Sequence, residues 1–417
     1  MNKEHMKISG RIRPVDIEEL CAAIVSSVEQ NTRLRLHGMD SKRGWSSAWC
    51  VPAQRSSKDL HALDMRGFDG IDIYEPEELV LRVGAATPMS EIQKHLQGNQ
   101  QELSFDPPDF APLYGGIAGT GTLGGVIACN LSGSRRVRSG AARDCVLGIE
   151  AVSGRGELFR SGGRVMKNVT GYDLPKLLTG SHGMLAAMTQ ITMKVLPASE
   201  TSVSVLFFNL EPDRAVVVMT QALSSAYEVS AAVYLPASVA TQAVPAATNT
   251  LTVLRLEGAE KSLPARVELL RKHLMEHGDS ELLQDDESRA LWSFIGDARF
   301  FATGERREDL LWRLFLPPSR SHHIDAFVRQ LGEAYYFLDW GGGLAWLGIS
   351  NEIKEKRVAC EKVAAFALEQ GGYGVLVRAP DELCGVFGGF SALGAVENAL
   401  MERVRAAFDP DGVFSPV

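Results

Sequence analysis

The sequence predicts an α+β protein with more than one unit, and three observations support this prediction. Residues 14–97 alternate between short strand patterns and helical patterns. Residues 105–125 hold three prolines and six glycines, too many for a strand. From about residue 201, strand and helix patterns alternate again, which suggests a second sheet with helices packed on it.

The composition is that of an ordinary soluble globular protein. The chain has 417 residues, which suggests two or three domains, with 45% hydrophobic and 23% charged residues. The formal net charge is −8. A negative chain has no general electrostatic attraction to nucleic acid or to an anionic membrane, so the composition disfavours both classes of partner.

The cysteines and the N-terminus bear on location and metal content. No C-x-x-C pair occurs, so we expect no zinc or iron–sulfur site and predict no metal. The first 14 residues lack the apolar core of a secretion signal, and no apolar run approaches 18 residues. We therefore expect a cytoplasmic protein with reduced thiols, which reaches a membrane only through a partner. The six cysteines are scattered: Cys21, Cys50, Cys129, Cys145, Cys360 and Cys384.

The first elements can be placed from capping residues and periodicity. Asp16 and Glu19 form a capping box before apolar residues at helical spacing over 17–28. Residues 32–38, "TRLRLHG", and 79–85, "LVLRVGA", read as strands.

Three further elements complete the first half. Thr87-Pro88 predicts a helix start, with Ile92 and Leu96 on the apolar face. Residues 145–163 predict a hairpin that turns at "GRG". Residues 183–197 predict a strand whose alternate residues share one face: Thr189, Ile191, Met193 and Val195.

The second half alternates strands and helices in one predicted sheet layer. The predicted strands cover 202–208, 251–258, 310–317 and 373–380. The predicted helices cover 213–226, 264–277, 322–332, 351–370 and 391–407.

A glycine motif raises the question of a dinucleotide site. Gly119–Gly124 fits G-x-G-x-x-G, and Asp144 lies at the acidic position of that fingerprint. A Rossmann turn needs a buried strand before the first glycine, but prolines precede it here, and Gly133 would cut the following helix short. The context therefore disfavours a Rossmann site.

Two glycine-containing loops still favour anion binding. Residues 37–44, "HGMDSKRG", follow a strand, and residues 115–125 form the glycine-rich loop. Glycine lets backbone N–H groups approach a phosphate closely, and two such loops suit a dinucleotide pyrophosphate. The alternative, two ordinary flexible turns, stays open at this point.

A resemblance extends these observations. "TLGGVIACNLSGSRRVRSGAARDCVLGIEAVSGRGEL" and "GGRVMKNVTGYDLPKLLTGSHGMLAAMTQITMKVLP" resemble the FAD-binding half of the vanillyl-alcohol-oxidase (PCMH-type) flavoproteins. The "KNVTGYDL" core is typical of their glycolate/D-lactate dehydrogenase branch. The resemblance covers 14–197, resumes at 337–347 and at the C-terminal "FDPDGVF", and is thin between 200 and 335.

The resemblance implies a set of FAD-binding residues. The first loop would wrap the pyrophosphate, although Met39 and Asp40 depart from its usual glycines, and Asp40 would repel a diphosphate unless it points away or Lys42 offsets it. Asn130 could instead cap a turn, and Asp144 could pair with Arg143 or Arg138. The implied residues are Gly38, Met39, Asp40, Ser41, Lys42, Thr122, Leu123, Gly124, Gly125, Asn130, Gly140, Asp144, Gly183, Ala187 and Thr189.

An arginine cluster adds one candidate, and the attachment positions predict the mode of binding. Arg138 is favoured for a cofactor or substrate contact among Arg135, Arg136, Arg138 and Arg143, although such a run is more often a solvated or partner-facing surface. Ser41 aligns with the position where some members attach FAD through histidine, and no cysteine lies between 104 and 119. The resemblance therefore implies non-covalent FAD.

Catalytic residues cannot be assigned from the sequence. The chain lacks the H-x-H motif of the larger dehydrogenases of this branch, and its single H-G-D, His277-Gly278-Asp279, stands without one. The pair at 322–323 reads as a capping or surface feature, and Arg299, Arg306 and Arg313 are candidate carboxylate clamps that no motif ranks. The aromatic segment 337–349 favours a buried hairpin over a subunit interface.

The implied organisation is a PCMH-type FAD-binding domain with two α/β subdomains over 1–200, a smaller α+β cap or substrate domain over 201–385, and a C-terminal segment over 386–417 that returns to the first domain. The implied function is the FAD-binding subunit of a glycolate oxidase complex, with a second flavoprotein subunit and an iron–sulfur subunit as partners. Two alternatives remain: a stand-alone FAD-dependent 2-hydroxy-acid dehydrogenase, and a structural subunit whose flavin never turns over.

Overall fold

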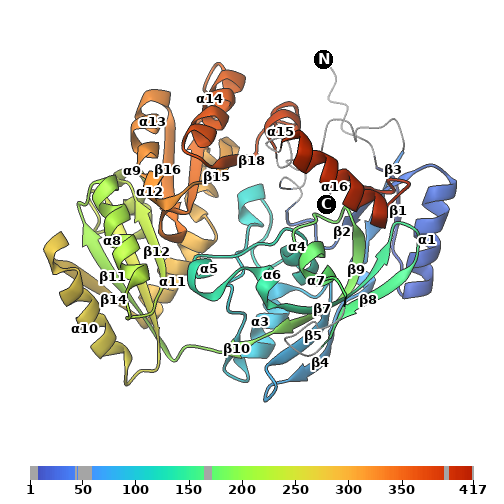
Figure 1. Cartoon of the computed structure of the whole chain (residues 1–417), viewed down its shortest axis with the longest axis horizontal. Coiled ribbons are helices and arrows are strands. Elements are labelled where there is room, and N and C mark those ends of the chain that lie inside the picture. The colour runs from blue at the N-terminus through green and yellow to red at the C-terminus, as the bar shows by residue number, and fades with distance from the viewer. Residues whose placement is uncertain (1–7, 43–44, 46–58, 164–170, 389–393, 416–417) are drawn as a thin grey trace. The chain divides into compact units, whose positions relative to one another are not determined.

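The computed structural model describes residues 8–42, 45, 59–163, 171–388 and 394–415. The chain divides into two compact units (Figure 1). Unit 1 contains residues 1–131, 141–197 and 393–417, and unit 2 contains residues 132–140 and 198–392. The chain therefore enters unit 2 briefly at residue 132, returns to unit 1 at residue 141, and enters unit 2 again at residue 198.

Unit 1 holds two main sheets and one short pair of strands. The four-stranded sheet is parallel, in the order β1-β3-β2-β19: Ile8–Ile12, Leu60–Asp64, Arg33–His37 and Phe414–Ser415. The five-stranded sheet is antiparallel, in the order β4-β5-β9-β7-β8: Ile71–Glu75, Val80–Gly84, Ala186–Lys194, Val146–Ser153 and Leu158–Gly162. The short pair is β6, Gln101–Glu102, with β10, Leu196–Pro197.

The helices of unit 1 cover these sheets. Leu20 and Ile24 of α1 belong to one hydrophobic cluster with Leu36 of the parallel sheet and Val152 of the antiparallel sheet. Helix α1 therefore packs against both sheets. The helices are α1 Ile17–Glu29, η2 Met65–Gly67, α3 Met89–Gln97, η3 Pro112–Tyr114, α4 Leu123–Ala128, α6 Ala142–Cys145, α7 Leu174–Leu178 and α16 Ala395–Phe408.

The C-terminal strand β19 supports the strand that leads to the first glycine-containing loop. Phe414 pairs with Leu34 of β2, whose N–H donates to Val413 O at 2.7 Å. The Asp409 carboxylate accepts the N–H groups of Val413 and Phe414 at 2.8 and 2.9 Å. The last described residues therefore help to fix β2.

Unit 2 is built on one eight-stranded sheet. Its neighbouring strands pair antiparallel, and its order is β14-β11-β13-β12-β16-β17-β15-β18. In that order the strands are Ser280–Gln284, Thr201–Phe208, Leu251–Gly258, Val229–Leu235, Ala334–Asp339, Leu344–Ile349, Leu310–Phe315 and Tyr373–Arg378.

Helices cover the hydrophobic face of this sheet. Side chains such as Leu254, Trp312 and Leu347 form one core with Met219 of α8 and Val363 of α14. The alternate residues of the same strands point to the opposite face, which also carries arginine, serine and aromatic side chains. The helices of unit 2 are α5 Arg136–Ser139, α8 Pro212–Ser224, α9 Ala237–Ala243, α10 Leu263–His273, η4 Met275–His277, α11 Asp285–Gly296, η5 Arg299–Phe301, η6 Gly304–Glu308, α12 Pro318–Ser321, α13 His323–Leu331, η7 Trp340–Gly342, α14 Lys356–Glu369 and α15 Asp381–Phe387.

The predicted elements agree with the structure except at helix starts and on one helix face. Asp16 caps α1, but Glu19 accepts from the N–H of Val15 instead of completing the box at Asp16. Val25, expected on the buried face of α1, is 41% exposed. Helix α3 begins at Met89, so Pro88 is its N-cap residue and not its first helical residue. The Thr87 hydroxyl donates to Gly84 O and does not cap the helix.

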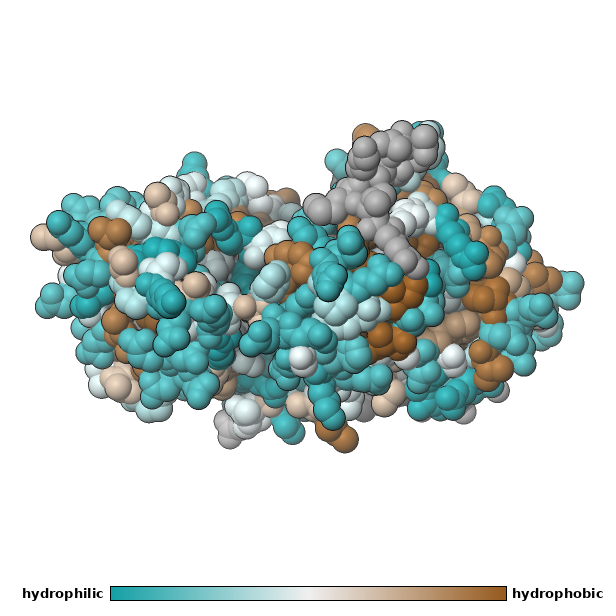
Figure 2. Space-filling model, turned by 90° about the horizontal axis from the view of Figure 1, so that it is seen from below, coloured by the Kyte–Doolittle hydropathy of each residue, from teal (hydrophilic) through white to brown (hydrophobic). Residues whose placement is uncertain are grey.

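The segment 337–349 forms a buried hairpin, as its sequence favours. Strands β16 and β17 pair antiparallel around the short helix η7, and Trp340 and Trp346 are buried in unit 2. Among the described residues, no helix is long and apolar enough to cross a membrane. The face in Figure 2 is mostly hydrophilic, with separate hydrophobic areas.

Candidate functional site

A pocket in unit 1 forms where strand β2 ends and helix α4 begins. It spans about 450 Å³ including the open space at its mouth, and the glycine-rich loop and the loop after β2 both contribute to it. Its lining residues are Leu36, His37, Gly38, Met65, Ala85, Ala86, Thr122, Gly124, Gly125, Ala128, Gly183, Ala186 and Met188.

Backbone hydrogen bonds hold the glycine-rich loop against residues 85–89. Leu123 N–H donates to Thr87 O at 3.0 Å, and Gly124 N–H donates to Ala85 O at 2.6 Å. A Cβ atom on Gly124 would lie 2.7 Å from that same Ala85 oxygen. Glycine at 124 is therefore required by the close approach of two backbone segments.

Asp109 shapes the start of the same loop. Its carboxylate accepts the N–H of Gly119 at 2.7 Å and that of Ala111 at 3.1 Å. These bonds close the proline- and glycine-rich segment into a defined turn. Thr122 then caps α4 by accepting Gly125 N–H at 3.3 Å.

Lys42 places a cation at the edge of the pocket. Its ammonium nitrogen lies 3.1 Å from the position that a Cβ atom on Gly125 would take and 3.4 Å from that on Gly121. Nζ also donates to Ser41 Oγ at 3.1 Å. Burial lowers the pKa of Lys42, while Cys129 and Asp109 act in the opposite direction. Because both glycines lack a Cβ atom, a partly desolvated ammonium lies close to the backbone of the glycine-rich loop, an arrangement that suits a phosphate.

Asp40 does not oppose this arrangement. Its carboxylate lies 3.7 Å from the guanidinium of Arg35, on the preceding strand. Because the positive charge of Arg35 offsets the negative charge of Asp40, this ion pair reduces the repulsion that Asp40 would exert on a diphosphate. Met39 beside it is 44% exposed and outside the pocket lining.

Asp64, the last residue of β3, is a buried carboxylate that precedes the pocket residue Met65. Asp64 pairs with His37 across the parallel sheet and accepts from Arg66 at 2.8 Å and from Arg11 at 2.7 Å. Burial raises the pKa of Asp64, but hydrogen bonds from Arg66 and Arg11 outweigh burial and hold that pKa well below its ordinary value. Burial lowers the pKa of His37, although Asp40 and Asp64 act against this shift.

The pocket brings together part of the predicted site. Ser41 and Lys42 adjoin its edge through the contacts above, while Leu123 and Ala187 are fully buried in unit 1. Thr189 bonds to Glu150 through its hydroxyl, and its carbonyl accepts Ala85 N–H at 2.9 Å. The predicted residues that line the pocket are Gly38, Thr122, Gly124, Gly125 and Gly183.

Three other predicted residues make local contacts. Asn130 Oδ1 accepts Arg143 N–H at 3.1 Å, which supports its alternative interpretation as a turn residue. Asp144 accepts Ala141 N–H at 2.9 Å and so stabilises the start of α6; no ion pair to Arg143 or Arg138 is seen among the described residues. Gly140 has φ +81°, which explains glycine there.

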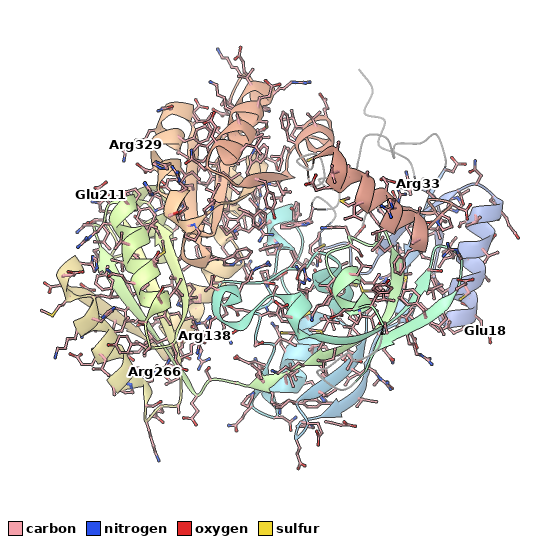
Figure 3. All side chains as sticks on the ribbon, in the orientation of Figure 1. Glu18, Arg33, Arg138, Glu211, Arg266 and Arg329 are labelled. Carbon is pink, nitrogen blue, oxygen red and sulfur yellow. The ribbon has the colours of Figure 1, made fainter. Side chains whose placement is uncertain are left out.

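Arg138 belongs to unit 2 and lies outside the pocket lining. Its guanidinium pairs with Glu228 at 3.1 Å, and Arg266 approaches the same carboxylate at 3.5 Å. Figure 3 labels Arg138 and Arg266. The whole short segment 132–140 binds unit 2. Ser134 Oγ donates to Asp339 at 2.8 Å, and Arg135 lies 3.4 Å from Glu257.

The lining also contains residues outside the predicted set, and all of them except His37 are apolar. Small apolar side chains carry no chemical signature, and neither Ala85 nor Ala86 stands in a motif. The signal that could have found Ala85 and Ala86 is their position directly after strand β5. The pocket residue His37 likewise lies at the end of a strand, β2. The missed lining residues are Leu36, His37, Met65, Ala85, Ala86, Ala128, Ala186 and Met188.

Within the described part of the chain, no group of three histidine, cysteine or carboxylate side chains could hold a metal ion. The pocket lining is mostly apolar, with glycine backbone from both loops, and Lys42 adds an ammonium at its edge.

Comparisons with known proteins agree with this chemistry. A family model described as "FAD binding domain" matches residues 8–162. Glycolate oxidase subunit GlcE of Escherichia coli is 34% identical over 363 residues, covering 85% of each chain. Glycolate oxidase subunit GlcD of Bacillus subtilis is 38% identical over 102 residues, 24% of this chain and 21% of that protein. The structure of 4-ethylphenol oxidase from Gulosibacter chungangensis superposes with a TM-score of 0.70 at 11% identity, covering 99% of this chain and 90% of that one.

Proposed function

The chain belongs to the family of FAD-linked oxidoreductases that includes glycolate oxidase subunit GlcE, and from this premise we propose that it is the FAD-binding subunit of a glycolate oxidase complex. It is an oxidoreductase of hydroxy acids with FAD as cofactor. The proposed reaction converts glycolate to glyoxylate. The observation that carries the proposal is the pocket of unit 1, where two separate loops supply glycine backbone and Lys42 supplies a cation.

The pocket residues fit the diphosphate of FAD. Gly125 and Gly121 let Lys42 Nζ approach the loop backbone more closely than a residue with a Cβ atom would allow. The ammonium is partly desolvated, so an anion next to it recovers the electrostatic energy that burial costs. The remaining wall is mostly apolar and suits an aromatic ring system. When bound, FAD supplies the acceptor for the hydride that leaves the substrate carbon.

We propose that FAD is held without a covalent bond. Ser41 occupies the position where some relatives carry a linking histidine. His37 lines the pocket, but its Nδ1 contacts the backbone oxygen of Gly38 at 3.3 Å, so we do not propose it as a linking histidine. In this proposal unit 1 is the FAD-binding domain and unit 2 is the cap or substrate domain.

The partners proposed are a GlcD-like flavoprotein and an iron–sulfur subunit. Relatives among both GlcE and GlcD support a multi-subunit complex. The iron–sulfur subunit is inferred because no cysteine spacing in this chain suits a cluster, so electrons need another carrier. Any membrane association in this proposal comes through the partners.

Dye reduction with glycolate tests the proposal. The single chain and the complex co-expressed with its partners are assayed at equal flavin content. We expect turnover by the complex and little or none by the chain alone. Full turnover by the single chain would favour a stand-alone 2-hydroxy-acid dehydrogenase, and a flavin that glycolate never reduces in either sample would favour a structural subunit.

A further inference from the structure

We propose that the short segment 132–140 transmits occupancy of the unit 1 pocket to unit 2, so that FAD binding also orders the turn at Trp340; this inference rests on the proposed function. The segment leaves unit 1 shortly after the pocket helix α4 and returns to unit 1 at residue 141. Its own residues belong to unit 2, although the chain on both sides of it belongs to unit 1. A ligand that fixes both ends of the segment therefore acts on unit 2 through the chain itself.

Both ends of the segment are tied to α4. Three residues of this helix line the pocket. The turn that leaves the helix is closed by Asn130 and Leu131, whose N–H groups each donate to α4 carbonyl oxygens at 3.0 Å. The returning chain is held to the same turn, because Asn130 Oδ1 accepts Arg143 N–H at 3.1 Å. A ligand that immobilises α4 therefore immobilises both ends of segment 132–140.

Buried polar contacts hold the segment within unit 2. The Ser134 hydroxyl donates to the Asp339 carboxylate at 2.8 Å, and both side chains are almost fully buried. Gly133 O accepts the indole N–H of Trp340 at 3.0 Å. Removing a hydrogen-bond partner from a buried carboxylate is costly, so Ser134 is a strong anchor for the segment.

The backbone that these anchors reach is strained. Trp340 has φ +54°, in the left-handed region that a bulky residue adopts only at a cost. Its N–H donates to the same Asp339 carboxylate at 2.7 Å, so the group that anchors the segment also holds the strained residue. When the segment leaves, the turn loses its indole contact and Asp339 loses the Ser134 bond, which favours a relaxed backbone. Docking of the segment therefore selects the strained arrangement of the turn.

The coupling follows from the entropy of docking. A segment with mobile ends loses more conformational freedom when it docks than a segment whose ends are already fixed. FAD in the pocket should therefore strengthen docking, and by thermodynamic reciprocity docking should strengthen FAD binding by the same factor. The exposed pair of Arg138 with Glu228 adds little, because solvent screens it.

Hydrogen–deuterium exchange of the full chain, with and without FAD, measures the coupling. We expect FAD to slow exchange in α4 and also, by about fivefold, in residues 339–343. Ser134→Ala should bind FAD about fivefold more weakly and should lose the FAD-dependent protection of 339–343. Trp340→Phe removes the indole donor to Gly133 O and, as a second anchor variant, should show the same loss.

Ser202→Ala is the matched control. Ser202 is likewise a fully buried serine of unit 2, but its hydroxyl contacts Ser288 Oγ at 2.9 Å and not the segment. This variant should keep the wild-type FAD affinity and the FAD-dependent protection of 339–343.

Two outcomes would overturn this inference alone. One is wild-type protein in which FAD protects α4 but leaves exchange in 339–343 unchanged. The other is FAD-dependent protection of 339–343 that persists at the wild-type level in both anchor variants. FAD that fails to protect α4 would count against the proposed function, and this inference would fall with it.

Discussion

Lys42 Nζ lies 3.1 Å from the point where a Cβ atom on Gly125 would stand, although 83 residues separate the two in the chain. The loop after β2 and the start of α4 therefore close one site from opposite sides. Every prediction about the cofactor depends on this approach.

Alanine substitutions at the neighbouring residues Gly124 and Gly125 should have different effects. A methyl group on Gly124 meets the backbone oxygen of Ala85 at 2.7 Å, so Gly124→Ala should lower the melting temperature. A methyl on Gly125 meets the flexible end of Lys42, so Gly125→Ala should fold normally and bind FAD less tightly. Calorimetry and FAD titration of both variants measure the contrast. Equal loss of stability in both would contradict it.

Gly125→Asp should abolish FAD binding more completely than Arg138→Ala. The new carboxylate would take the place of a phosphate beside Lys42 and would repel the diphosphate. Arg138 instead pairs with Glu228 in unit 2, and both side chains are more than half exposed, so its removal should leave FAD bound. The flavin absorbance per chain of the two purified variants measures this difference. Wild-type flavin content in Gly125→Asp would place the cofactor elsewhere.

Lys42 should stabilise the complex with FAD at the expense of the apoprotein. Burial lowers the pKa of Lys42, so its buried charge destabilises the folded apoprotein at neutral pH. This destabilisation is lost as the pH rises through the lowered pKa, because Lys42 then becomes neutral in the folded state. Lys42→Met should therefore raise the melting temperature of the apoprotein and weaken FAD binding by about tenfold or more.

Lys42→Arg serves as the control, because it keeps the charge. It should retain most of the FAD affinity. A lower melting temperature of the Lys42→Met apoprotein would contradict the assignment of Lys42 as a desolvated cation.

Asp64 should make the chain sensitive to acid. Its folded-state pKa is depressed, so the stability that it contributes is present above its unfolded pKa of about 4 and is lost as pH falls below that value. Asp64→Asn should cost about 2 kcal/mol at pH 7 and should flatten the fall in stability below pH 4. Urea unfolding at pH 7 and pH 3 measures both effects. A wild-type pH dependence in the variant would refute this role.

Local features of the fold were predictable because their determinants are adjacent in sequence. The N-cap of α1 at Asp16 and the β7–β8 hairpin follow from neighbouring residues. The pairing of Phe414 with Leu34 was not predictable, since it joins residues far apart in the chain and rests on a two-residue strand.

The predicted residues that line the candidate pocket are four glycines and Thr122. A required glycine leaves a mark in the sequence, whereas Ala85 and Ala86 line the pocket merely because strand β5 ends beside α4. For Arg138, proximity to the glycine loop in the sequence does not place the residue in the pocket lining. It follows the glycine loop in sequence, but the chain crosses into unit 2 at residue 132 and returns at 141, which removes this arginine from the pocket lining.

The most direct test of the account is the flavin released from the purified chain by acid precipitation. Non-covalent FAD in the unit 1 pocket predicts about one FAD per chain in the supernatant and a colourless pellet. Flavin that stays with the denatured protein would contradict the non-covalent site, and a purified chain that neither contains nor takes up FAD would contradict the central claim.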